Sequence, residues 1–219
     1  MSAAMSGSRH RALVIACGAL AHEIAALRRI NGWDHLEVQC LPPELHNTPR
    51  QIPQRVRLAI QAARGRFDRI FVAYGDCGTG GQLDAVLAAE GVERLPGAHC
   101  YEFFAGTQAF TQMSEAEPGT FYLTDFLVRH FDRLVVRTLG IDAHPQLTGE
   151  YFRNYRRVVY LRQAPADQGD AAGQAALIAR RLGLAFEIRV TGYGELQHSL
   201  RRVAEPGIRA STGRTAWLR

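Results

Sequence analysis

The sequence contains no lysine: all 26 of its basic residues are arginines, and the 219-residue chain carries a formal net charge of +5. This excludes a Schiff-base lysine, a pyridoxal-phosphate anchor and the lysine of a Walker A motif. The arginines are scattered, often in pairs, and no RNA- or DNA-binding motif accompanies them. The sequence therefore does not indicate a nucleic-acid partner.

Long apolar runs are also missing. No run reaches the roughly 18 residues that a membrane-spanning helix needs, so we expect no membrane association. The segment from Met1 to Arg11 is small and polar and leads directly into a strand-like run, unlike a secretory signal. We therefore expect a cytoplasmic protein, whose cysteines stay reduced and act as ligands or catalysts.

Short β-rich runs alternate with helical patterns along the chain. This predicts an α/β fold: a mainly parallel sheet with helices on both faces, Rossmann-like layers, and a ligand site at the C-terminal edge of the strands. We expect flexible ends at 1–10 and 205–219 and a single domain over 11–204. The predicted strands are Ala12–Cys17, Leu36–Leu41, Arg69–Tyr74, Arg157–Leu161 and Ala185–Val190. The predicted helices lie near Ala19–Ile30, Pro53–Ala63, Leu83–Ala89, Thr107–Met113, Ala171–Leu182 and Gly194–Val203.

Two further stretches have less regular patterns. Ala98–Phe104 is short and apolar and is interpreted as a strand or loop. The apolar spacing over Phe121–Leu139 is typical of a helix. Within it, Thr124 or Asp125 is expected to cap a helix that begins at Phe126, although both could instead face a ligand site.

Three of the four cysteines fall near predicted strand ends. Cys17 ends the first strand, Cys77 lies just past the third, and Cys100 lies in a turn before an aromatic run. Because parallel strands end at one edge of a sheet, we expect these three thiols to be neighbours. Glycines follow Cys17 and Cys77 and allow the backbone to approach a ligand closely. The alternative is that the cysteines are simply small buried hydrophobic residues.

Three thiolates suit Zn²⁺ with an open fourth position, or an iron–sulfur cluster with one iron not bound by cysteine. The chain has no C-x-x-C pair, which argues against a zinc ribbon. His46 and Glu102 are candidate proton carriers, and Glu23 could reach back towards the site from the first helix unless it is an ordinary helix-surface residue. The candidates for a fourth ligand are His46, His99, Glu102, Cys40 or water.

A glycine-rich loop, Gly75–Gly81, follows the third predicted strand. Backbone N–H groups at a helix start can hold an anion, so Gly78, Gly80 and Gly81 are candidate cofactor-binding residues. The spacing differs from a G-x-G-x-x-G fingerprint, which favours a tight ligand-facing turn over a nucleotide site. Arg162, at the end of the fourth predicted strand, could pair with a carboxylate or phosphate of a substrate.

Several motifs together resemble the domain-of-unknown-function family 1638 over about residues 11–200. They are ACGAL with a following Glu, LPPELHNTP, YGDCGTGG, HCYEFFAG, FYLTDFL and YLRQ. By position, the resemblance points to Cys17, His46, Cys77, Cys100 and Glu102. Members of this family are often encoded beside corrinoid-dependent methyltransferases and their reactivating proteins, so the resemblance implies a corrinoid protein or a methyltransferase as partner.

We therefore expect a zinc-binding protein that takes a small-molecule substrate, and three functions stay open. The first is an enzyme of corrinoid-linked methyl transfer, with zinc acting as a Lewis acid. The second is a non-catalytic accessory protein that carries a metal, an iron–sulfur cluster or a corrinoid for a partner methyltransferase. The third is a metal-free enzyme in which Cys77, beside a helix start, is a nucleophile of lowered pKa.

Overall fold

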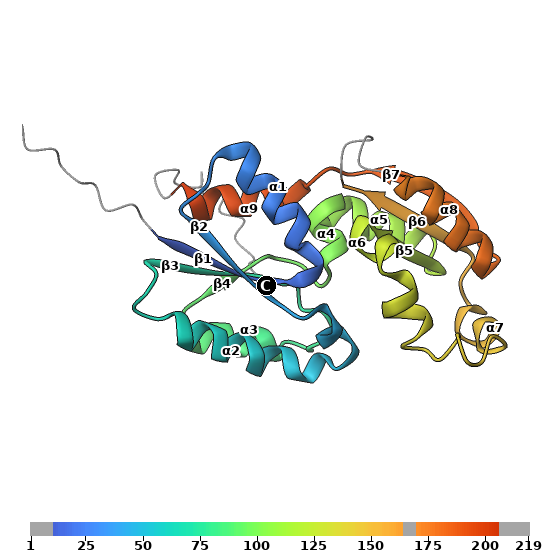
Figure 1. Cartoon of the computed structure of the whole chain (residues 1–219), viewed down its shortest axis with the longest axis horizontal. Coiled ribbons are helices and arrows are strands. Elements are labelled where there is room, and N and C mark those ends of the chain that lie inside the picture. Colours follow the sequence, from blue (N-terminus) through green and yellow to red (C-terminus); the bar gives the residue numbers. More distant parts are fainter. Residues whose placement is uncertain (1–10, 164–169, 206–219) are drawn as a thin grey trace, which may run out of the picture.

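The computed structural model describes residues 11–163 and 170–205. The described strands form two parallel sheets, of order β2-β1-β3-β4 and β5-β6-β7. Figure 1 shows the sheets next to each other along the long axis, and we call each sheet with its helices the first half and the second half. The α/β prediction is confirmed, although the strands divide between two sheets. The predicted flexible ends, 1–10 and all of 205–219 except Glu205, lie outside the described residues.

The sheet of the first half is built around β1, whose six residues are all apolar and buried. A continuous apolar run of this kind is typical of a central parallel strand covered on both faces. In its register, Ala16 of β1 is paired with Cys40 on one side and with Ala73 on the other. The strands are β1 (Ala12–Cys17), β2 (Leu36–Leu41), β3 (Arg69–Ala73) and β4 (Glu93–Arg94).

Helices cover both faces of this sheet, α1 and α9 on one and α2 and α3 on the other (Figure 1). The face of α2 that meets the sheet carries Ile52, Val56, Ile60 and Ala63, an apolar stripe at helical spacing. Short 3₁₀ turns η1 (Gly18–Leu20), η2 (Pro43–Asn47) and η3 (Pro49–Gln51) follow β1 and β2. The helices are α1 (Ala21–Asn31), α2 (Ile52–Ala63), α3 (Gln82–Glu90) and α9 (Gly194–Ala204).

The second half contains β5 (Thr120–Thr124), β6 (Arg157–Arg162) and β7 (Ala185–Val190). One face packs against α6 (Asp125–Arg129), the π-helical turn η4 (Asp132–Val136), α7 (Leu147–Phe152) and α8 (Ala171–Leu182). The other face carries Tyr122, Val159 and Leu161, which pack against aromatic and apolar side chains of α4 (Cys100–Ala105) and α5 (Thr107–Ala116). Each half therefore has a core of its own.

The helices and strands expected with clear boundaries are present, within about three residues at each end, but the two irregular stretches differ from expectation. The helical pattern over Phe121–Leu139 corresponds to β5 followed by α6 and η4, and the expected cap is confirmed, since the hydroxyl of Thr124 accepts a hydrogen bond from the N–H of Leu127. The stretch Ala98–Phe104 contains the start of α4, which His99 and Glu102 begin with a capping box. None of the helices in the described ranges is long and apolar enough to span a membrane.

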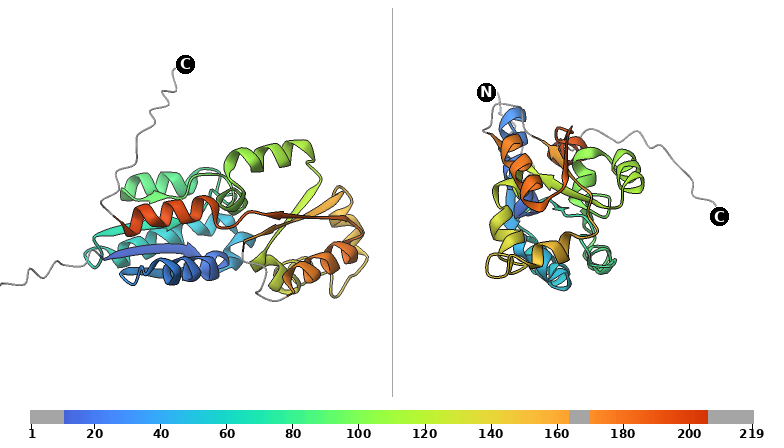
Figure 2. Two further views of the ribbon diagram at one scale, coloured as in Figure 1. Left: turned by 90° about the horizontal axis from the view of Figure 1, so that it is seen from above. Right: turned by 90° about the vertical axis from the view of Figure 1, so that its right-hand side faces the viewer.

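The chain crosses between the halves twice. It passes to the second half through α4 and α5 and returns after β7 to place α9 on the first sheet, as the view from above in Figure 2 shows. At the return, Gly194 has φ +45°, and an added Cβ atom there would lie 2.4 Å from the carbonyl oxygen of Phe103. Only glycine fits this contact, which fixes α9 against α4.

Candidate functional site

Two of the three candidate ligands are buried at the C-terminal edge of the first sheet. Cys17 is the last residue of β1, and its Sγ atom accepts a hydrogen bond from the backbone N–H of Ala19 at 3.3 Å. Cys77 follows β3 and has φ +50°, the one positive φ of a non-glycine residue in the described ranges. Its N–H donates to the carbonyl of Ala98 at 2.9 Å, which holds this strained turn beside the start of α4.

Cys100 begins α4, and its thiol interacts electrostatically with the other two. Burial is the main cause that raises the pKa of all three thiols, to about 12 for Cys17, to about 11 for Cys77 and well above the ordinary range for Cys100. A negative charge on Cys77 raises the pKa of Cys17, and charges on Cys77 and Cys17 raise that of Cys100. Cys17 and Cys77 lie in the buried core of the first half and Cys100 packs against it, while Cys40 lies exposed on the edge strand β2.

Two histidines stand beside these thiols. The Nδ1 atom of His46, in η2, lies 4.0 Å from Sγ of Cys17, and the Nδ1 atom of His99 lies 3.6 Å from Sγ of Cys100. Burial, with a smaller effect of the charge on His46, lowers the pKa of His99 to about 4, so its imidazole is neutral at pH 7. A neutral imidazole is the form that binds a metal.

Both histidines and Cys100 line a cavity of about 200 Å³ between the two halves. Its wall also contains Tyr101 and Thr124. As placed, no three Cys, His, Asp or Glu side chains in residues 11–163 and 170–205 are positioned to hold one metal ion. The donors are therefore gathered around one region but not assembled into a coordination sphere.

Glu102 has a structural contact in this region. Its Oε1 atom accepts hydrogen bonds from the N–H groups of Ala98 (2.8 Å) and His99 (3.2 Å), which completes the capping box of α4. The carboxylate thereby fixes the turn that carries His99 and Cys100.

The glycine-rich loop is closed by its own aspartate. The carboxylate of Asp76 accepts hydrogen bonds from the N–H groups of Gly80 (3.1 Å) and Gly81 (2.8 Å) and from the hydroxyl of Thr79 (2.7 Å). These bonds lower the pKa of Asp76 and occupy the N–H groups that could hold an external anion. Gly78 has φ +81° and provides the tight turn directly after Cys77.

Arg162 ends β6 at the C-terminal edge of the second sheet. Its backbone carbonyl accepts hydrogen bonds from the N–H and the hydroxyl of Thr191, which also belongs to the second half. The Nε atom of Arg162 is buried and has no hydrogen-bond partner among the described residues. The next residue, Gln163, is buried, and its side-chain Oε1 accepts from the N–H of Asp125 at 2.8 Å. Arg162 does not line the cavity at Cys100.

A second pocket of about 200 Å³ is lined by residues of α1 and α6. Its wall contains Glu23, which the sequence marked as a possible neighbour of the site, and Asp125. No sequence signal marks the other charged and aromatic residues of its wall, Arg29, Arg129 and Tyr193, which resemble ordinary surface residues.

A family model whose description is "Protein of unknown function (DUF1638)" matches residues 40–200. The chain belongs to this family. The DUF1638 match includes His46, Cys77, Cys100 and Glu102, whereas Cys17 precedes it. No match was found among curated proteins or solved structures. The DUF1638 description states no activity, so the function has to be argued from the site.

Proposed function

We propose that this DUF1638 protein binds a thiophilic metal ion, zinc in the first place, through Cys17, Cys77 and Cys100. The observation that supports the proposal is that Cys17 of β1 and Cys77 of the β3–α3 loop are buried in the core of the first half, with Cys100 of α4 packed against it. Thiolates select zinc or an iron–sulfur cluster over Mg²⁺ and Ca²⁺.

The donor set fits such an ion chemically. The imidazole of His99, whose Nδ1 atom lies 3.6 Å from Sγ of Cys100, can supply a fourth ligand, and His46 stands 4.0 Å from Sγ of Cys17. The raised pKa values mean that the thiols are protonated before metal arrives, so binding releases protons and draws the side chains together. When bound, zinc supplies a Lewis acid that can activate a substrate thiol.

His46 is the proton carrier in this proposal, and Glu102 is a positioning residue. The Nδ1 atom of His46 lies 2.9 Å from the carbonyl oxygen of Pro43, which can only accept, so Nδ1 carries the hydrogen. This leaves Nε2 as the atom that takes up or releases a proton. Glu102 holds the backbone of Ala98 and His99 instead.

We assign the site to methyl transfer linked to a corrinoid, on the strength of the family resemblance. The cavity of about 200 Å³ beside Cys100 offers space for a small substrate. The alternative is an accessory protein that carries a metal, an iron–sulfur cluster or a corrinoid for a methyltransferase. A visible absorption band of the purified protein, or co-purification of a corrinoid protein, distinguishes this alternative from a colourless zinc enzyme.

The protonated thiols weigh against a metal-free cysteine nucleophile. Reactive cysteines have lowered pKa values, whereas burial raises that of Cys77 to about 11. The N–H groups of the following loop that could lower it donate to Asp76.

Elemental analysis of protein purified without oxygen tests the metal proposal. The wild type should carry about one zinc per chain, and Cys77→Ser should lose it because one of three thiolates is gone. Cys40→Ser is the matched control, since Cys40 is exposed on β2, and it should keep the metal. Equal zinc in the Cys77→Ser and Cys40→Ser variants would overturn the proposal.

A further inference from the structure

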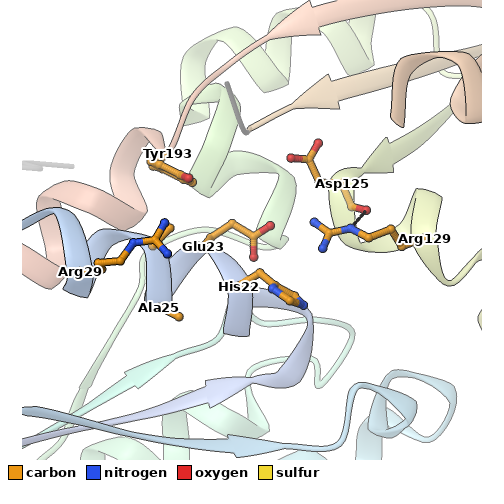
Figure 3. A pocket seen from close by; sticks show the side chains of 8 residues that line it. His22, Glu23, Ala25, Arg29, Asp125, Arg129 and Tyr193 are labelled. Carbon is orange, nitrogen blue, oxygen red and sulfur yellow. Dashed lines mark hydrogen bonds between the residues drawn. The ribbon is translucent and has the colours of Figure 1, made fainter. Parts of the chain in front are cut away.

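The pocket between α1 and α6 has charged walls from both halves of the molecule. Figure 3 shows Glu23 between the guanidinium groups of Arg29 and Arg129, with Tyr193 and Asp125 above it in the view. Arg29 and Glu23 come from α1, Asp125 and Arg129 from α6, and Tyr193 from the return to α9. The site is thus complete only where the two halves meet.

Glu23 is the residue of this pocket that indicates a ligand. Its side chain is 4% exposed, and its Oε2 atom is buried without a hydrogen-bond partner among the described residues. A buried carboxylate oxygen without a partner costs free energy that a ligand N–H group can recover. The carboxylate of Glu23 points into the pocket, so such a group would meet it there.

The remaining wall carries both signs of charge. Asp125 is fixed by the hydroxyl of Tyr160 at 2.6 Å and presents a second carboxylate. Arg129 donates from Nε to the backbone carbonyl of Asp125 at 3.1 Å, and neither Arg129 nor Arg29 forms an ion pair within the described part of the chain. With Glu23 ionised, two carboxylates and two guanidinium groups balance, which suits a ligand without net charge but with separated charges.

We propose that this pocket binds a small zwitterion of the α-amino-acid type. Its ammonium group lies between Glu23 and Asp125 under the ring of Tyr193, and its carboxylate is bound by Arg29, on the side of Tyr193. The volume of about 200 Å³ is below the roughly 300–1,000 Å³ of pockets for drug-sized molecules, so the ligand is small. Carboxylate recognition by guanidinium and cation contact with an aromatic ring are both established modes of binding.

This inference does not depend on the metal proposal, because none of the three cysteines lines the pocket. The two sites are nevertheless neighbours: Ala19 and Thr124 line the cavity at Cys100, while Glu23 and Asp125 line this pocket. An amino acid bound here would therefore lie beside the cysteine region.

Isothermal titration calorimetry with glycine, L-alanine and L-serine tests the proposal, with acetate and methylammonium as ligands of one charge each. We expect at least one amino acid to bind and neither single-charge ion to bind comparably. Glu23→Gln should weaken binding about tenfold or more through loss of a charged hydrogen bond. Arg29 is exposed and its side chain forms no hydrogen bond or ion pair with the described residues, so Arg29→Gln should weaken binding without disturbing the fold. Glu93→Gln, at an exposed carboxylate of β4, should not weaken it.

Three results would each overturn the proposal: no amino acid binds the wild type, acetate or methylammonium binds as well as glycine, or Glu23→Gln binds like the wild type. Far-UV circular dichroism of each variant separates loss of binding from loss of fold. The Arg29→Gln variant keeps the test decisive if the substitution at buried Glu23 disturbs the structure.

Discussion

The burial of Glu23 predicts a specific dependence of stability on pH. Burial raises the pKa of this carboxyl from 4.5 to about 7; the charge on Asp125 adds to the shift and that on Arg129 opposes it. His22, Arg29 and Tyr193 border the same pocket. Because the folded pKa exceeds the unfolded one, the folded state holds the proton more tightly between pH 4.5 and 7. Stability is therefore lost as the pH rises through this window.

The magnitude follows from the shift. At roughly 1.4 kcal/mol per pKa unit, ionisation of Glu23 costs the folded state about 3 kcal/mol once the pH is above the folded pKa. Glu23→Gln removes this cost because the amide does not ionise. Relative to the wild type, the variant should thus gain about 3 kcal/mol of unfolding free energy between pH 4.5 and 8.

Urea denaturation of both proteins at several pH values, in buffer without amino acids, measures this difference. Titrations of all other groups occur in both proteins and cancel to first order. Glu93→Gln, which changes an exposed carboxylate, controls for the loss of one charge. Two results would refute the reasoning. The unfolding free energies of wild type and Glu23→Gln could differ by the same amount at every pH, or the wild type could become the more stable protein at high pH.

Three further predictions test other parts of the structure. Gly194→Ala should lower the unfolding free energy by about 3 kcal/mol or more in a thermal melt, because its Cβ atom would lie 2.4 Å from a carbonyl oxygen of α4. Gly192→Ala, with nothing within 4 Å, should cost only about 1 kcal/mol, and equal losses would contradict the assigned contact. Asp76→Ala should cost about 1 kcal/mol because it removes the hydrogen bonds that close the exposed glycine loop, and an unchanged melting temperature would count against this role. In metal-free protein at neutral pH, iodoacetamide should label exposed Cys40 well before Cys77, whose pKa is about 11; the reverse order by peptide mass spectrometry would revive the nucleophile hypothesis.

Local patterns predict most elements of this fold. The apolar run of β1 and the helical stripe of α2 depend on neighbours in sequence, so their periodicity is visible in the chain. The strand β5 was missed because it is mostly buried, lacks an alternating pattern and runs directly into α6. The start of α4 was missed because histidine is not a usual N-cap residue, although the spacing of His99 and Glu102 fits a capping box.

The division into two sheets has no local signal. The sequences of β5, β6 and β7 resemble those of the strands in the first half. Contacts between distant segments of the chain decide which strands pair. The same limit applies to the pocket at Glu23. Its partners Arg129 and Tyr193 are more than a hundred residues away in the sequence and meet it only because the chain crosses between the halves twice.

Candidate ligands were easier to place, because the end of a parallel strand has a known position in the fold. Cys17 could be assigned to a sheet edge from its strand alone, and Cys77 from the glycines after it. The role of the loop after Cys77 could not be assigned in this way, because the carboxylate of Asp76 accepts hydrogen bonds from the N–H groups of the loop. An aspartate ahead of a Thr-Gly-Gly sequence is a signal for such a turn.

X-ray absorption at the zinc edge tests the proposed metal site most directly. The sample is the full chain, purified without oxygen and supplied with one equivalent of zinc. The predicted coordination shell of the zinc ion contains three sulfur atoms at about 2.3 Å and one nitrogen or oxygen atom. Zinc that fails to stay bound through gel filtration, or that shows a shell of nitrogen and oxygen alone, would contradict the claim that Cys17, Cys77 and Cys100 hold one ion.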